Sequence, residues 1–92
     1  MTKYLYVSML KWSSGFTMDH YNSTWKPKHD ELAKKHGLLL KYQGTPFGSS
    51  DDACLVYESD TELDGYRDFR FAIATIEGGA VTSANTTIVA LD

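Results

Sequence analysis

The sequence predicts one α+β domain over residues 1–92, in which four strands form an antiparallel sheet and two helices cover one of its faces. Four short stretches rich in aromatic, aliphatic and β-branched residues are bounded by turn residues, as strands usually are. Two longer stretches between them place apolar residues at helical spacing. The resulting order, βαββαβ, is that of the ferredoxin-like split βαβ arrangement.

The first strand and the first helix are predicted from the N-terminal third of the chain. KYLYVSMLKW, residues 3–12, reads as a strand, and the following SSGFT breaks it. Thr17 is an expected N-cap for a helix that runs to about His36, with Gly37 as its C-cap.

The next two strands are predicted to form a hairpin. LLLKYQ, residues 38–43, and ACLVYES, residues 53–59, flank the turn-rich segment GTPFGSSDD. VTSANTTIVAL, residues 81–91, is the expected fourth strand.

The second helix is predicted to begin at an Asp60 or Thr61 cap and to end at Gly78 and Gly79. Part of it, DFRFAIATI, also alternates with the period of a strand. The helix is preferred because the apolar positions extend over too many residues for a strand. Phe71 then lies off the apolar face, so it is exposed or covered by something outside the subunit.

One face of the first helix carries most of its large side chains. They fall within an arc of about 80° that holds no lysine, aspartate or glutamate, and they are Met18, Tyr21, Trp25, His29, Leu32 and His36. Pro27 lies in the middle of this helix, where it removes one backbone hydrogen bond. Either Pro27 kinks a single helix, or a second helix restarts with Thr24 as its N-cap.

The candidate functional site is a pocket between this helix and the sheet. His29 is the candidate catalytic acid or base, because burial can tune the pKa of an imidazole. Tyr21 and Trp25 are candidate aromatic walls, and His36 and Tyr42 complete the substrate-binding set. The alternative is that His29 is a hydrogen-bonded core residue and that the aromatic side chains only fill the interior.

The sequence predicts no metal site and no cofactor. His29 and His36 share a helix face but lie roughly 10 Å apart along the axis, too far to bind one metal without another ligand. Cys54 is expected to be an inert, small hydrophobic side chain in a strand. No glycine-rich phosphate motif and no triad spacing are found.

Both faces of the predicted sheet carry apolar side chains. Leu5, Val7 and Met9 alternate with larger side chains in the first strand, and the third strand shows the same two-sided pattern. Two helices can cover only one face. We therefore expect a homodimer, or a larger closed oligomer, that covers the second face.

Charge and composition limit the function classes further. Residues 1–41 carry a net charge of +4 and residues 42–92 a net charge of −7. Because the helix lysines point in several directions, we expect no nucleic-acid surface. There is no hydrophobic run of membrane-spanning length and no signal peptide pattern, so no membrane association and a cytoplasmic location are expected.

Four segments carry a resemblance to a known superfamily: MTKYLYVSMLKW, LAKKHGLLLKY, FGSSDDACLVYESD and GGAVTSANTTIVAL. The chain resembles the dimeric α/β barrel superfamily, in which two ferredoxin-like subunits pair their sheets, and within it the GYD-domain proteins. The glycine, tyrosine and aspartate signature of that family reads GSSD at residues 48–51, without the tyrosine.

The spacing of Tyr21, Trp25, His29 and Leu32 is similar to an aromatic, tryptophan, histidine and leucine pattern in the EthD-type branch of the same superfamily. The resemblance implies binding of a small apolar or aromatic molecule, with cofactor-free proton-transfer catalysis as one outcome. A non-catalytic assembly or ligand-sensing module is the alternative, and haem binding through His29 or His36 is the weakest one. Whether the protein is an enzyme stays open.

Overall fold

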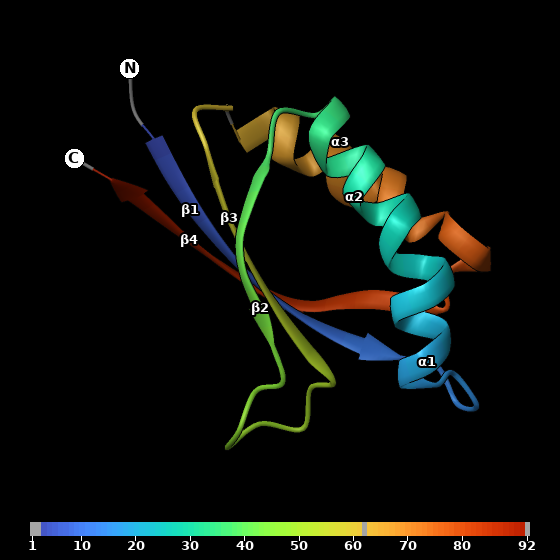
Figure 1. Ribbon diagram of the computed structural model, residues 1–92. Coiled ribbons are helices and arrows are strands. Elements are labelled where there is room, and N and C mark those ends of the chain that lie inside the picture. The colour runs from blue at the N-terminus through green and yellow to red at the C-terminus, as the bar shows by residue number, and fades with distance from the viewer. Residues whose placement is uncertain (1–2, 62, 92) are drawn as a thin grey trace.

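The structure is a computed structural model that describes residues 3–61 and 63–91. Its elements are β1 (Lys3–Trp12), α1 (Met18–His20), η1 (Tyr21–Trp25), α2 (Lys26–Lys35), β2 (Leu39–Gly44), β3 (Ala53–Ser59), α3 (Leu63–Ala74), η2 (Ile76–Gly78) and β4 (Val81–Leu91). The predicted order of strands and helices is confirmed (Figure 1).

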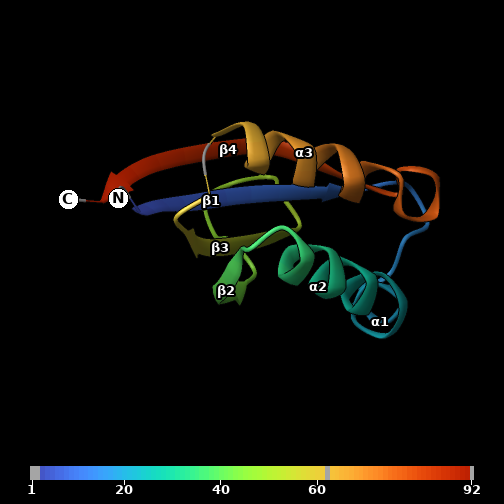
Figure 2. The ribbon, with the colours of Figure 1, turned by 90° about the horizontal axis from the view of Figure 1, so that it is seen from above.

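The four strands form one antiparallel sheet in the order β2-β3-β1-β4. The two central strands, β1 and β3, are neighbours although a helix and another strand separate them in the sequence. The helices lie on one face of the sheet, as two views show (Figures 1 and 2). This is the predicted α+β ferredoxin-like fold.

Both predicted ends of the first helical region are confirmed. The Thr17 hydroxyl accepts a hydrogen bond from the His20 backbone N–H at 3.1 Å, which makes Thr17 the N-cap. At the other end Gly37 has a φ of 75°, and the Leu38 N–H donates to the Ala33 carbonyl at 2.8 Å. This is a Schellman motif, and it turns the chain into β2.

Pro27 neither restarts the helix nor separates two helices. Residues Tyr21–Trp25 form a π-helical segment, in which the Lys26 N–H donates to the Tyr21 carbonyl, and α2 continues directly from it. Pro27 then lies in the first turn of α2, where a missing N–H is tolerated. Of the two alternatives for Pro27, the restart with Thr24 as N-cap is therefore wrong, since no side chain caps α2.

The helical assignment of the second helical region is confirmed, with a shorter extent than predicted. α3 ends at Ala74 and is followed by the 3₁₀ turn η2. The described part of α3 begins at Leu63, and the predicted cap at Asp60 or Thr61 depends on residue 62, which lies outside the described residues. Phe71 is 66% exposed, as its position off the apolar face predicted. In the described part of the chain, no helix combines the length and the apolar character needed to cross a membrane.

The core lies between the helices and the inner face of the sheet. Alternate residues of β1 and β3 face the helices and are buried: Tyr6, Ser8, Leu10, Ala53, Leu55, Tyr57 and Ser59. The helices contribute Tyr21, Trp25, His29, Ala33, Tyr66, Phe69 and Ile73. The fully buried side chains include several aromatic rings, so stacking and edge contacts hold much of this small core together.

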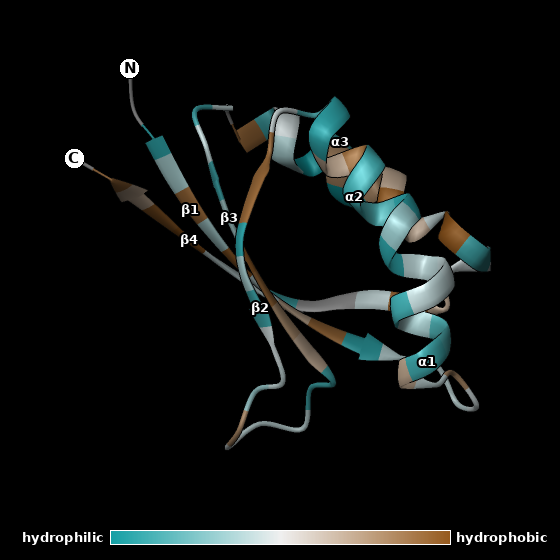
Figure 3. Ribbon diagram, viewed as in Figure 1, coloured by the Kyte–Doolittle hydropathy of each residue, from teal (hydrophilic) through white to brown (hydrophobic). Residues whose placement is uncertain are grey.

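The outer face of the sheet is also apolar but has no helix over it. The strand residues that alternate with the buried ones are only half-buried. They are Leu5, Val7 and Met9 on β1 and Cys54 and Val56 on β3. Apolar residues occur along the strands (Figure 3). The prediction that both faces of the sheet are apolar is confirmed.

A β-bulge in β2 decides the orientation of Tyr42. Leu40 pairs with Tyr57 on the inner face, but after the register shift Tyr42 pairs with Val56. A one-residue shift of register moves a side chain to the opposite face of a sheet. Tyr42 therefore lies on the outer face, 70% exposed, away from the helices.

Candidate functional site

Four aromatic rings stack along the inside of the first helical region. Trp12 at the end of β1 packs on Tyr21 with ring centroids 5.1 Å apart, Tyr21 stacks on Trp25 at 5.3 Å, and Trp25 stacks on His29 at 5.0 Å. In an α-helix, side chains four residues apart are offset around the helix axis. The wider π turn at Tyr21–Trp25 reduces the rotation per residue, which brings these rings closer into line.

His29 ends this stack and is hydrogen-bonded at both ring nitrogens. Nδ1 lies 3.0 Å from the Asp30 carboxylate, and Nε2 is hydrogen-bonded to the hydroxyl of Tyr57 on β3. Lys26 Nζ donates to the same Asp30 oxygen at 2.8 Å. These four side chains form a hydrogen-bonded chain from the helix surface to the inner face of the sheet.

The electrostatics of this hydrogen-bonded chain determine which of its atoms carry protons. Burial lowers the pKa of His29, although the hydrogen bond to Asp30 acts in the opposite direction. Burial raises the pKa of Asp30, but the hydrogen bonds from Lys26 and His29 outweigh it and leave the pKa below its usual value. Because a carboxylate can only accept, Nδ1 carries the proton of the neutral ring, and Tyr57 donates its hydroxyl proton to Nε2. Burial keeps the pKa of Tyr57 well above its usual value.

The imidazole of His29 has no exposed surface, whereas the Asp30 carboxylate is 51% exposed. Asp30 is thus at the solvent end of the hydrogen-bonded chain, and His29 and Tyr57 are at its buried end. A ligand could touch the ring only after a neighbouring side chain moved. The arrangement matches the alternative of a hydrogen-bonded core histidine more closely than that of an accessible catalytic base.

A small pocket lies beside Tyr21, the second ring of the aromatic stack. Its volume is about 180 Å³, and it is lined by Met18, Tyr21, Asn22, Gln43, Gly44, Thr45, Asp52, Ala53 and Leu55. The lining thus comes from α1, η1, β2, the β2–β3 connection and β3. We call it the Tyr21 pocket.

Three buried polar atoms of the stack have no hydrogen-bond partner within the described residues: Trp12 Nε1, the Tyr21 hydroxyl oxygen and Trp25 Nε1. A buried polar group without a partner is costly, so each such group needs an explanation such as a bound water or ligand. Burial and the nearby Asp30 charge raise the pKa of Tyr21 to about 12. Its hydroxyl is therefore a neutral group that could both donate to a ligand and accept from one.

The structure brings together three of the five predicted site residues. Tyr21, Trp25 and His29 are stacked in one line, whereas His36 lies at the far end of α2 with its ring 6.0 Å from that of Phe69. Tyr42 is separated from all of them by the sheet.

The sequence did not predict the two partners of His29, which are Asp30 and Tyr57. It also did not predict Lys26, which donates to Asp30. A signal for Tyr57 was available, because the alternation of the third strand placed Tyr57 and Leu55 on the same face. Asp30 adjoins His29 in the sequence, but a contact between consecutive helix residues is not expected from helical spacing.

Within residues 3–61 and 63–91, no group of three or more histidine, cysteine, aspartate or glutamate side chains is placed to hold a metal ion. Cys54 lies half-buried on the outer face of β3, and burial raises the pKa of its thiol.

Comparison with solved structures shows likeness of fold. A mutant chlorite dismutase from Candidatus Nitrospira defluvii matches with a TM-score of 0.66 and 13% identity, over 98% of this chain and 40% of that enzyme. The chain thus spans less than half the length of that enzyme.

Two structures of proteins closer in length to this one match over most of both chains. A dimeric ferredoxin-like protein of unknown function from Thermobifida fusca gives a TM-score of 0.50 at 16% identity, over 98% of this chain and 90% of that one. A dimeric protein of unknown function with a ferredoxin-like fold from Bacteroides fragilis gives 0.53 at 16% identity, over 99% and 95%.

No protein-family model matches the sequence. No curated protein matches it either. The GYD and EthD resemblances therefore stay predictions from the sequence, while the ferredoxin-like fold is established.

Proposed function

We propose that this protein self-associates through the outer face of its sheet and binds a small, mostly apolar organic molecule in the Tyr21 pocket. The observation that carries the proposal is the Tyr21 side chain, which lines this pocket and whose buried hydroxyl has no hydrogen-bond partner within the described residues. The volume of the pocket, about 180 Å³, is smaller than that of drug-sized sites, so the ligand is about the size of a single ring. An oxygen on that ring would meet the hydroxyl, and Leu55 and Ala53 would contact its apolar part.

The test uses p-cresol as the probe in an amide NMR titration of the intact protein. We expect shifts centred on Met18, Asn22 and Ala53, and weaker binding by Tyr21→Phe, because the variant loses the hydrogen bond to the probe oxygen. Tyr42→Phe is the matched control, since it removes a tyrosine hydroxyl from the other face of the sheet. The absence of shifts at high millimolar p-cresol, or equal affinity in Tyr21→Phe, would contradict the proposal.

Self-association is supported by the apolar outer face. Leu39, Tyr42 and Val89 are exposed there beside the half-buried residues of β1 and β3. The ferredoxin-like proteins from Thermobifida fusca and Bacteroides fragilis are described as dimeric. A second copy packed sheet to sheet would cover this face, as in the barrel arrangement that the sequence resembles.

Proton-transfer catalysis with His29 as acid or base is the second candidate. It is supported by the chain from half-exposed Asp30 through His29 to Tyr57, which could pass a proton between solvent and the interior. The alternative is a non-catalytic assembly or sensing module in which this chain is structural. His29→Gln separates the two. A structural role predicts lower stability with p-cresol affinity unchanged, whereas a role of His29 in the site predicts weaker p-cresol binding by a variant that stays folded.

Haem binding is the weakest candidate. Both ring nitrogens of His29 are already hydrogen-bonded, so iron ligation would require one of these bonds to break. Added haemin should therefore give no Soret shift that depends on His29.

A further inference from the structure

We propose that the groove between α3 and β4 is a second binding site, for an organic carboxylate with an apolar body. It lies at the β4 edge of the sheet, whereas the Tyr21 pocket lies near the β2 edge, so the inference does not depend on the function proposed above.

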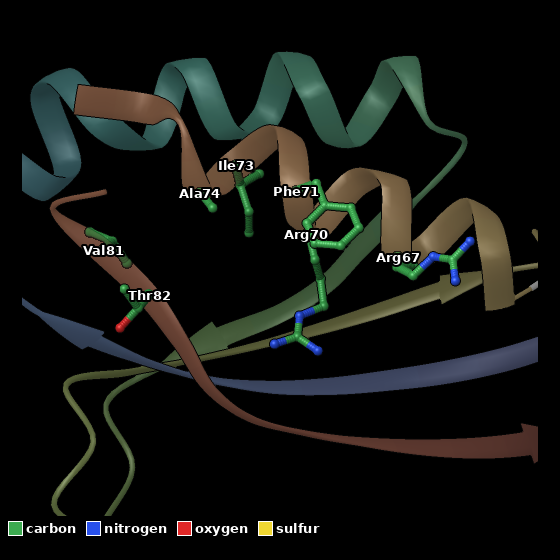
Figure 4. A pocket seen from close by; sticks show the side chains of 7 residues that line it. All are labelled: Arg67, Arg70, Phe71, Ile73, Ala74, Val81 and Thr82. Atoms are coloured by element: carbon green, nitrogen blue, oxygen red, sulfur yellow. The ribbon is translucent and has the colours of Figure 1, made fainter. Parts of the chain in front are cut away.

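The groove is large and mostly apolar. Its volume is about 440 Å³, within the range of small-molecule sites, and its lining is Arg67, Arg70, Phe71, Ile73, Ala74, Val81 and Thr82 (Figure 4). The buried side chains of Ile73 and Val81 form its floor. We call it the α3–β4 groove.

α3 turns a second stripe toward this groove, beside the stripe that packs in the core. Residues 67, 70, 71 and 74 follow the spacing i, i+3, i+4 and i+7, so they share one side of the helix. The stripe holds two arginines and Phe71, whose ring is mostly exposed and not required by the core. A large exposed aromatic side chain beside cations is typical of a binding surface.

The charges select an anionic ligand. Arg67 and Arg70 are the only basic residues between positions 42 and 92, a region with nine acidic residues, and both line the groove. None of the residues that line it is acidic. A guanidinium that borders an apolar groove can bind a carboxylate with two parallel hydrogen bonds.

Arg70 is the main anchor. Its side chain extends from α3 toward the strands (Figure 4), and it makes no ion pair within the described residues. Arg67 lies 3.6 Å from Asp64, but both side chains are well exposed, so this pair is weak and can exchange for a ligand. Both arginines are inside α3, away from its free N-terminal N–H groups, so the phosphate-binding geometry of a helix start is missing. Together with the mostly apolar lining of the groove, this favours a monocarboxylate with an apolar body over inorganic phosphate.

The test compares 2-naphthoate with 2-naphthalenemethanol, which has the same rings without the charge, and with inorganic phosphate. Binding is followed by amide NMR on the full chain. The expected result is that naphthoate shifts the amides of Ile73, Ala74 and Val81, that the alcohol binds at least tenfold more weakly, and that phosphate does not bind there.

The variants are Arg70→Gln and Arg67→Gln, with Lys34→Gln as the matched control, which removes an exposed helix cation away from the groove. Arg70→Gln should weaken naphthoate binding about tenfold, Arg67→Gln less, and Lys34→Gln not measurably. All three positions are exposed, so folding should be unaffected.

Three results would overturn the inference: no naphthoate shift at the groove at millimolar concentration, equal affinity for the alcohol, or naphthoate affinity unchanged in Arg70→Gln. Phosphate binding as tight as naphthoate would overturn the assignment of a carboxylate. Because p-cresol reports on the Tyr21 pocket and naphthoate on the groove, each proposal can fail without the other.

Discussion

The hydroxyl of Tyr57 on β3 is hydrogen-bonded to Nε2 of His29 on α2, and both side chains are buried. This bond joins the helix to a central strand of the sheet. Its other end is fixed by Asp30 and Lys26, so the interior polar groups of this contact are satisfied. The consequences for stability can be measured whether or not the protein is an enzyme.

Tyr57→Phe should lower the free energy of unfolding by about 1–3 kcal/mol, because it leaves the buried Nε2 acceptor without a donor. Urea unfolding followed by circular dichroism measures the change. Tyr42→Phe is the matched control and should change stability by less than about 0.5 kcal/mol, since that side chain is exposed. If Tyr57→Phe is as stable as the control, the hydrogen bond between Tyr57 and His29 does not contribute to the stability of the fold.

The pH dependence of stability should show a contribution from His29. Its pKa is lowered in the folded state, so the unfolded chain binds a proton more readily. Stability should therefore be complete above about pH 6.5, the pKa of an unperturbed histidine, and should fall as the pH is lowered through and below that value. For one proton the slope is at most about 1.4 kcal/mol per pH unit.

His29→Gln is the comparison for this measurement. It keeps His20 and His36, so the difference between the two stability curves isolates the contribution of His29. Asp30, Lys26 and Tyr57 are the charged or titratable partners in its hydrogen-bonded chain, and all three remain in the variant. Parallel curves between pH 5 and 7 would show that the folded state does not depress the pKa of His29.

Much of the fold could be predicted because the signals are local. Thr17 and Gly37 mark the two ends of the helical region by their own local chemistry, and the alternation in β1 sorts its residues correctly into the two faces of the sheet. Phe71 was predicted off the core face from helical spacing alone, and it is exposed.

The site could be predicted only in part because its other features depend on non-local contacts. Tyr57 reaches His29 only after β3 has paired with β1, and Tyr42 changes face because of a bulge against β3. The π segment before Pro27 was also missed, because a proline predicts disruption of a helix but does not specify which irregular backbone absorbs it.

A charge placed on the outer face of the sheet should block self-association. Val7 pairs with Val56 on one side and Thr87 on the other, so Val7→Lys places an ammonium in the middle of that face. An unpaired buried charge at an interface is strongly unfavourable. Sedimentation equilibrium at several concentrations should show a dimer or larger assembly for the original chain and a monomer for Val7→Lys.

Phe71→Lys is the control for this experiment. Like Val7→Lys, it replaces an apolar side chain by lysine, but Phe71 is an exposed residue of α3, whereas Val7 is a half-buried residue on the outer face of the sheet. It should leave the assembly unchanged. A monomeric original chain at high protein concentration, or dissociation by Phe71→Lys alone, would contradict association through the sheet.

Gly37→Ala should lower the free energy of unfolding by about 1–2 kcal/mol. Gly37 has a left-handed backbone with φ of 75°, a conformation that costs L-residues about this much. An added Cβ would also lie 3.2 Å from Thr61 Oγ1, the hydroxyl that donates to the His36 carbonyl. The substitution therefore strains both the end of α2 and its contact with the segment before α3.

Gly44→Ala is the control, because Gly44 has no left-handed φ and an added Cβ there meets no atom within 4 Å. That variant should be as stable as the original chain or slightly more stable, since alanine lowers the entropy of the unfolded state. Urea unfolding of both variants measures the difference. Equal stabilities would mean that the turn after α2 accepts a side chain by changing its backbone, and that the contact between Thr61 and the His36 carbonyl does not hold this turn in place.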